Sequence, residues 1–190
     1  MKIAGEKHIG RREFLGYMFS AAVLPLMPED FLSCRLERLL GERSLSFYNI
    51  HTGERLDTVY WSMGRYHLDA LSRINHIMRD HRTGKVEQID PGLLEILHTL
   101  KKQYDVKEPF HLISGYRTPR TNHILSIQSH DVAPKSLHMS GRAADIRLPG
   151  VKLSTLRETA MDLALGGVGY YPKSDFVHID TGRVKHWQGT

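Results

Sequence analysis

Residues Gly166–Asp180, with the sequence GGVGYYPKSDFVHID, indicate two short β-strands joined by a turn. The predicted strands are Val168–Tyr171 and Phe176–Asp180, because both are rich in β-branched and aromatic side chains and the residues between them suit a turn. Side chains alternate between the two faces of a strand. His178 and Asp180 are therefore expected to share one face, while the apolar residues beside them enter the core.

Upstream of this stretch, helical and strand patterns follow one another from Leu45 onward. Asp90 with Pro91, and Ser154, are the expected starts of two helices. We expect a β-hairpin over 45–61, helices over 68–84, 90–100, 118–125 and 154–165, a surface loop over 126–136, and strands over 110–114 and 143–148. Because helices come first and strands cluster late, the pattern favours an α+β fold with an antiparallel sheet.

The first residues carry an export pattern. Arg11 and Arg12 precede a short apolar run, 16–27, which is too short to span a bilayer comfortably. Paired arginines ahead of such a run are typical of the twin-arginine (Tat) export signal. The alternative is an amphipathic first helix of a cytosolic domain, but Gly16 and the lack of a polar face disfavour it.

We therefore predict an export signal over 1–33, a connector over 34–44 and one domain over 45–190. The Tat export machinery is the expected partner for the signal, and the periplasm is the expected location.

Cysteine content and net charge limit the disulfides, lipid anchors and binding partners that can be expected. Cys34 is the only cysteine, so no intramolecular disulfide can form. It ends a weak match to a lipoprotein box, which Glu29 and Asp30 interrupt, so lipid anchoring at Cys34 is a minor alternative. The net charge of +5 at pH 7 suits an anionic polymer, either the cell wall or nucleic acid. Because no cluster of Lys and Arg with interleaved aromatic residues is present, nucleic acid is not an expected partner.

Three residues have the character of metal ligands. His138 and Asp145 lie in the segment SLHMSGRAAD (136–145), and His178 lies on the predicted last strand. Catalytic zinc takes three protein ligands of the His, Asp or Glu type and keeps a fourth position open, whereas structural zinc is usually closed by several cysteines. A single cysteine excludes the closed kind. On the residues alone, a hydrogen-bonded His178–Asp180 pair and an ordinary loop histidine at 138 remain equal alternatives.

Several motifs together resemble one family. They are Ser136-x-His138-x-x-Gly141-x-Ala143-x-Asp145, Val177-His178-Ile179-Asp180 and Ser114-Gly115-Tyr116-Arg117, with further matches at 49–54, 89–93, 166–172 and 186–187. With these motifs, residues 45–187 resemble the zinc D-Ala-D-Ala peptidase and lysostaphin-type metallopeptidase superfamily, and within it the MepK (YcbK-like) murein endopeptidases. The resemblance implies a small antiparallel sheet that carries the zinc and is flanked by helices, as in the D-Ala-D-Ala peptidase or hedgehog-like fold.

The resemblance also implies roles for individual residues. One Zn2+ ion would be bound by His138, Asp145 and His178. Arg117 would hold the substrate carbonyl or carboxylate and stabilise the developing oxyanion, since a guanidinium is always charged and forms paired hydrogen bonds. Ser136 would line the substrate pocket.

The general base is a separate question. Several relatives have a carboxylate three residues before the last histidine, and here that position is Asp175, which is the candidate base. The alternative is that Asp175 is an ordinary turn aspartate. Other relatives have a histidine two residues before the last ligand, where this chain has Phe176. Asp180 is expected to be either a hydrogen-bond partner of His178 or a sheet-edge charge.

The function that these features predict is zinc-dependent hydrolysis of the peptide cross-links of peptidoglycan in cell-wall remodelling. One alternative is a wall-binding zinc module without catalysis. Another is a D,D-carboxypeptidase or dipeptidase that acts on small peptides. Tyr170, Tyr171 and Trp187 are candidates to line a substrate groove, although aromatic side chains at such positions more often pack in the core or at its rim. The cross-link that is cut and the oligomeric state are left open.

Overall fold

The computed structural model describes residues 41–129 and 132–189. The chain divides into two compact units, Met1–Gly41 and Glu42–Thr190, and the described helices and strands belong to the second. The predicted export signal, Cys34 and most of the predicted connector lie outside the described residues. Strand β1 begins at Arg43, so the second unit includes the last residues of that connector. Within the described residues, no helix is long and apolar enough to cross a membrane.

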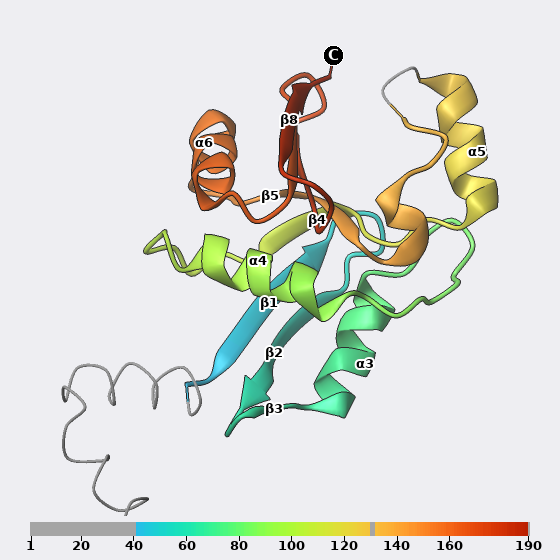
Figure 1. The fold of residues 1–190 in the computed structure, drawn as a ribbon. Coiled ribbons are helices and arrows are strands. Elements are labelled where there is room, and N and C mark those ends of the chain that lie inside the picture. The colour runs from blue at the N-terminus through green and yellow to red at the C-terminus, as the bar shows by residue number, and fades with distance from the viewer. Residues whose placement is uncertain (1–40, 130–131, 190) are drawn as a thin grey trace, which may run out of the picture. The chain divides into compact units, whose positions relative to one another are not determined.

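The described part of the second unit contains four α-helices, one 3-10 helix and eight strands (Figure 1). The helices are α3 (Leu68–Ile77), α4 (Pro91–Lys101), α5 (Pro119–Gln128), the 3-10 helix η2 (Leu137–Ser140) and α6 (Leu153–Leu163). The strands are β1 (Arg43–Asn49), β2 (Arg55–Ser62), β3 (Arg65–Tyr66), β4 (Phe110–Ser114), β5 (Ala143–Arg147), β6 (Gly167–Tyr171), β7 (Phe176–Asp180) and β8 (Lys185–Gln188).

All eight strands form one sheet in the order β3-β2-β1-β4-β5-β7-β6-β8. Neighbouring strands are antiparallel except for two parallel pairs, β1 with β4 and β6 with β8. The α+β class is confirmed, but the expectation of a small antiparallel sheet is wrong, because the sheet is mixed and larger. Between β1 and β4 the chain passes through β2, β3, α3 and α4, and local sequence pattern cannot show a pairing over such a connection.

One face of the sheet carries the hydrophobic core. The strand residues on this face are Leu45, Phe47, Phe110, Leu112, Ala144, Ile146, Val177 and Ile179, and all of them are buried. Helices α3, α4 and α6 cover the face with side chains such as Ile74, Leu97 and Leu156. Each large apolar side chain buried in this way contributes about 1.5–3 kcal/mol to the free energy of folding. Because side chains alternate along each strand, the opposite face is left for polar residues.

Several predicted helix starts are confirmed. Asp90 is the N-cap of α4, where its Oδ1 accepts a hydrogen bond from Gly92 N at 2.8 Å, and Pro91 occupies the first turn. Thr118 is the N-cap of α5, and its Oγ1 accepts from Thr121 N at 3.2 Å. α5 stands apart from α3, α4 and α6 in Figure 1.

Three other helix boundaries differ from expectation. α3 ends at Ile77 rather than at Gly84, because Asp80 draws the following residues into a turn in which Gly84 N donates to Asp80 O at 2.7 Å. α6 starts two residues earlier than predicted, with Lys152 rather than Ser154 as N-cap, and Leu153 packs against the core. α5 continues through Gln128, so the predicted loop is shorter.

Candidate metal centre

The register of the sheet places five residues, three of them polar, in one row across five strands. Ser114 on β4 pairs with Asp145 on β5, and Asp145 pairs with His178 on β7. His178 then pairs with Gly169 on β6, which pairs with Trp187 on β8. Paired residues on adjacent strands project to the same face with Cβ atoms about 4.5–5.5 Å apart. Asp145 and His178 are therefore direct neighbours on the face opposite the core.

His138 reaches these two residues through the 3-10 helix η2. Ser136 caps the helix, and its Oγ accepts from His138 N at 3.4 Å. Gly141 ends it in the left-handed conformation with φ 66°. A Cβ atom on Gly141 would lie 2.2 Å from Gln88 O, so no other residue fits this turn. The backbone thus folds back between His138 and Asp145, as the sequence predicted.

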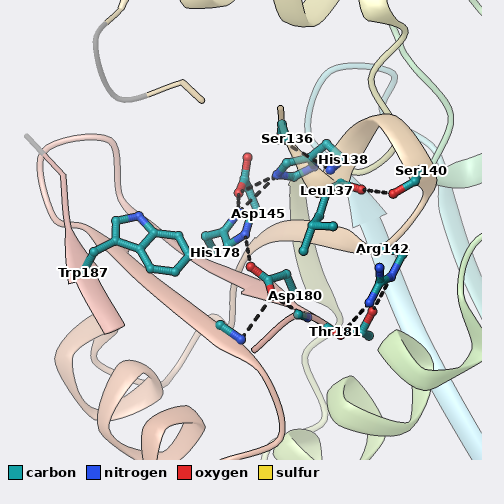
Figure 2. A network of polar contacts seen from close by, with 12 residues as sticks. Ser136, Leu137, His138, Ser140, Arg142, Asp145, His178, Asp180, Thr181 and Trp187 are labelled. Atoms are coloured by element: carbon teal, nitrogen blue, oxygen red, sulfur yellow. Dashed lines mark hydrogen bonds and ion pairs between the residues drawn. The ribbon is translucent and has the colours of Figure 1, made fainter. Parts of the chain in front are cut away.

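Three ligand atoms converge in the close-up view (Figure 2). His138 Nε2 lies 3.2 Å from Asp145 Oδ1 and 3.2 Å from His178 Nδ1, and His178 Nδ1 lies 2.9 Å from Asp145 Oδ1. Tetrahedral zinc with bonds of about 2.0–2.1 Å separates its ligand atoms by roughly 3.3 Å. The spacing of these donors fits a single metal ion within a few tenths of an ångström.

The other nitrogen of each imidazole ring has a hydrogen-bond partner, which fixes the orientation and the tautomer of the ring. His138 Nδ1 lies 2.6 Å from Gly115 O, and His178 Nε2 lies 3.1 Å from Asp180 Oδ2. Since a carbonyl or carboxylate oxygen can only accept, each of these nitrogens carries the hydrogen, and the other nitrogen presents a lone pair. Two lone pairs and one carboxylate oxygen therefore point at one another, an arrangement that a cation stabilises.

The protonation states agree with such a site. Burial lowers the pKa of His138 to about 4, so its ring is neutral near pH 7. Burial alone would raise the pKa of Asp145, but the neighbouring His138 and Arg117 hold it well below its ordinary value. Burial alone would lower the pKa of His178, but hydrogen bonds to Asp145 and Asp180 raise it. Because a histidine binds a metal through an unprotonated nitrogen, a metal cation at this position would compete with protonation of His178 Nδ1.

Arg117 lies directly against the three ligand residues. Its Nη2 donates to Asp145 Oδ2 and lies 3.0 Å from His138 Nε2, while its Nε donates to Ser114 Oγ at 2.8 Å. Its backbone N donates to His138 O at 3.2 Å. Arg117 is only 9% exposed. A guanidinium fixed in this way can stabilise negative charge that develops next to the metal ligands.

The loop that carries Arg117 is held to the end of α3 on both sides. Tyr116 N donates to Met78 O at 2.7 Å, and Thr118 donates to Asp80 Oδ2 through its backbone N at 2.9 Å and through Oγ1 at 2.8 Å. Gly115, directly before Tyr116, is also required, because a Cβ atom there would lie 2.3 Å from Met78 O.

The three ligand residues form part of the wall of a cavity of about 560 Å³. Its wall also includes Ser114, Arg117, Ser136, Tyr171, Asp180 and Trp187. Figure 2 shows Trp187 beside His178, and their ring centroids are 5.2 Å apart. A buried His, Asp and His set that faces a cavity of this size is the kind of centre that metal-dependent hydrolases use.

Asp175 is the one predicted catalytic residue that the structure does not bring into this cavity. It lies in the turn between β6 and β7 with φ 54° and forms an ion pair with Arg147 on β5. With Arg147 and His111 it lines a second cavity of about 260 Å³ on the same unit. Its geometry is that of the turn aspartate that the sequence left as the alternative.

Lys185, Arg82 and His51 also line the main cavity, and sequence reasoning did not single them out. Lys185 lies on β8, an edge strand of four residues without clear alternation, and Arg82 lies in the turn that was expected to be helix. His51 lies in the turn of the β1–β2 hairpin, where its Nε2 is 2.9 Å from Ile113 O. Only the motif match at 49–54 pointed to this last segment.

Comparison with known proteins agrees with the class of site. A family model described as "Peptidoglycan L,D-endopeptidase MepK" matches residues 38–187. The chain is 41% identical over 180 residues to the Peptidoglycan L,D-endopeptidase MepK of Escherichia coli (strain K12), covering 93% of this chain and 96% of that protein. It is 38% identical to the Probable peptidoglycan L,D-endopeptidase MepK of Haemophilus influenzae, covering 94% and 96%. No solved structure matches the chain significantly.

Fold and site together define a metallopeptidase-type hydrolase. The chain belongs to the family of MepK peptidoglycan L,D-endopeptidases.

Proposed function

We propose that this protein is a zinc-dependent murein endopeptidase that hydrolyses peptide cross-links of peptidoglycan. The observation that carries the proposal is the convergence of His138 Nε2, Asp145 Oδ1 and His178 Nδ1 within 3.2 Å of one another at the wall of a cavity. Zinc is the ion of choice for two imidazoles and one carboxylate with tetrahedral spacing. The names of the similar proteins support an L,D bond as the target.

In the proposed mechanism, a zinc ion bound by these residues supplies polarisation of the scissile carbonyl and acidification of the attacking water. Arg117 stabilises the negative charge that develops on the carbonyl oxygen, and Ser114 keeps its guanidinium in place. Gly115 and Asp180 hold the outer ring nitrogens of His138 and His178, which turns His138 Nε2 and His178 Nδ1 toward the position that the ion would occupy. Asp175 pairs with Arg147 and is not among the residues that line the cavity, so we assign it no step in this mechanism.

The test uses purified protein and isolated peptidoglycan. The wild type is expected to release uncross-linked muropeptides, and a chelator is expected to stop the release until zinc is added back. His138→Ala and His178→Ala should each lower the rate by more than about 1000-fold, since each removes a ligand of the ion on which the reaction depends. Asp175→Asn is expected to stay within a few-fold of wild type.

The products separate the alternatives. A binding module would sediment with peptidoglycan and release nothing. A carboxypeptidase or dipeptidase would shorten free stem peptides but leave cross-linked dimers intact. Dimers joined through a D-Ala bond or through a bond between two diaminopimelate residues, offered separately, identify the bond that is cut.

We also propose that the chain is exported by the twin-arginine route and works in the periplasm, on the basis of Arg11 and Arg12 ahead of the short apolar run. Changing both arginines to lysine should retain the protein in the cytoplasm, as fractionation would show.

For the fold, we propose a sheet of the D-Ala-D-Ala peptidase type, which family membership supports.

A further inference from the structure

The cavity beside the metal ligands has an excess of positive charge. Its lining side chains include four permanent cations: Arg82, Arg117, Lys135 and Lys185. The two carboxylates in the same lining, Asp145 and Asp180, are buried and engaged by their histidine neighbours. A metal dication would add to the excess. A site of this charge attracts anionic groups on its ligand.

Lys185 is placed in this cavity by a specific local arrangement. The parallel register of β6 and β8 sets Lys185 opposite Gly167 and Trp187 opposite Gly169. Gly169 makes room for the indole, because a Cβ atom there would lie 2.6 Å from Trp187 Cε2. Trp187 Nε1 then donates to Tyr171 OH at 2.9 Å. The indole is thereby held over Gly169 and beside His178.

The ammonium of Lys185 lies 4.7 Å from the centroid of this indole, a cation–π contact. Among the described residues no carboxylate pairs with Lys185, whereas Arg43, Arg142 and Arg147 each have an acidic partner. An ammonium that is positioned by an aromatic ring, without a carboxylate, retains its capacity to bind an anion.

We propose that Lys185, positioned by Trp187, binds a carboxylate of the cross-linked peptide next to the scissile amide. This inference rests on the proposed endopeptidase function and concerns the substrate that this site prefers. When one amine of a diamino acid such as diaminopimelate is acylated to form the cross-link, the carboxylate on the same carbon atom stays free. That carboxylate is two bonds from the scissile nitrogen. It would reach Lys185 on the His178 side of the metal ligands, where Trp187 contacts His178.

The experiment compares two synthetic cross-linked peptide dimers, one with this carboxylate free and one with it amidated. The wild type is expected to cleave the free acid with a kcat/KM about tenfold higher, the factor expected for one charge-assisted hydrogen bond. Lys185→Met should bring the ratio close to one, mainly by slowing cleavage of the free acid. Lys185→Arg should keep most of the preference, because the charge is retained.

Lys173→Met is the matched control. Lys173 is an exposed lysine in the β6–β7 turn and does not line the cavity, so the preference should be unchanged. Melting temperature and bound zinc confirm that each variant is intact, and Lys185→Gln replaces Lys185→Met if the latter does not fold.

The outcomes distinguish the carboxylate subsite from the endopeptidase function. Equal cleavage of both dimers by the wild type, or an unchanged preference in Lys185→Met, would overturn the carboxylate subsite and leave the endopeptidase function standing. Cleavage of neither dimer would overturn both.

Discussion

Asp180 accepts hydrogen bonds from the His178 ring and from the backbone amides of Gly167 and Gly182. It is only 2% exposed. Burial alone would raise its pKa, but these donors lower it, so the carboxylate stays charged. Its charge keeps the hydrogen on His178 Nε2 and leaves Nδ1 free for a metal.

Replacing Asp180 with alanine should therefore weaken metal binding while the three ligands remain. We expect the zinc affinity of Asp180→Ala to fall about 10–100-fold, the usual effect of losing the partner that orients a metal-binding histidine. Competition with a chromophoric chelator measures it. Asp175→Ala, an equal truncation in the neighbouring turn, should bind zinc like the wild type. Equal affinity of both variants would refute the role of Asp180.

The identity of the three ligands could be predicted from sequence, but their geometry could not. The motif around His138 and Asp145, with His178 downstream, pointed to the residue types that a metal requires. The choice of Nε2 in His138 depends on Gly115 O, 23 residues away along the chain, which no local pattern indicated. The contact of His178 with Asp180 was one of the two roles expected for Asp180. Only strand register reveals which residues flank the site.

At the scale of elements, Gly167 on β6 packs closely against the carboxylate of Asp180 on β7. A Cβ atom on Gly167 would lie 2.5 Å from Asp180 Oδ2. Gly167→Ala must therefore displace this carboxylate or shift the strand, at a cost of about 1–3 kcal/mol in the free energy of unfolding.

A double-mutant cycle tests this fit. The same substitution made in Asp180→Ala should cost at least about 1 kcal/mol less, because the clashing group is gone. Urea unfolding of the wild type, both single variants and the double variant measures the difference. Strictly additive effects would show that the two residues do not compete for this space.

Asp80 links the end of α3 to the start of α5 and is buried. Burial alone would raise its pKa, but hydrogen bonds from Thr121, Thr118 and Arg82 N lower it. The folded pKa of Asp80 lies below the unfolded value of about 3.9. The contribution of the charged carboxylate to the free energy of unfolding is therefore fully present above that pH, and it is lost as the pH falls toward the folded pKa.

Asp80→Asn should accordingly be less stable than the wild type by about 1–3 kcal/mol at pH 7. The difference should narrow from about pH 4 downward, where the carboxyl of the unfolded wild-type chain begins to take up a proton while that of the folded protein is still charged. Urea unfolding at a series of pH values measures it, with the exposed Asp105→Asn as the matched control. If the difference in free energy of unfolding between the wild type and Asp80→Asn stayed constant down to pH 2, a charge effect would be excluded.

Elements were predictable where local signals were strong. α4 has an Asp90–Pro91 start and an unbroken buried side of Leu93, Leu94, Leu97 and Leu100. β8 has no such signal, because its four residues are mostly exposed and pair on one side only. The parallel pairing of β1 with β4 was missed because it depends on the packing of two intervening helices rather than on either strand.

At the scale of the whole molecule, metal binding and folding should be coupled. The ligands come from β5, β7 and η2, which are assembled only in the folded protein. Zinc at about 1,000 times its dissociation constant adds about 4 kcal/mol to the free energy of unfolding. For a chain of this size the melting temperature should rise by roughly 10 °C. Calorimetry with zinc or with chelator measures this, and a similar rise in His178→Ala would contradict the assigned ligand.

The position of β8 at the edge of the sheet affects how the protein responds to low concentrations of denaturant. β5 and β7 lie inside the sheet with a neighbour on each side, whereas β8 is an outermost strand held through β6 alone. Marginal strands fray well before the interior opens. The preference for a free carboxylate that Lys185 provides should therefore be lost at denaturant concentrations that leave the metal ligands on β5 and β7 in place. The enzyme would lose selectivity before it lost activity.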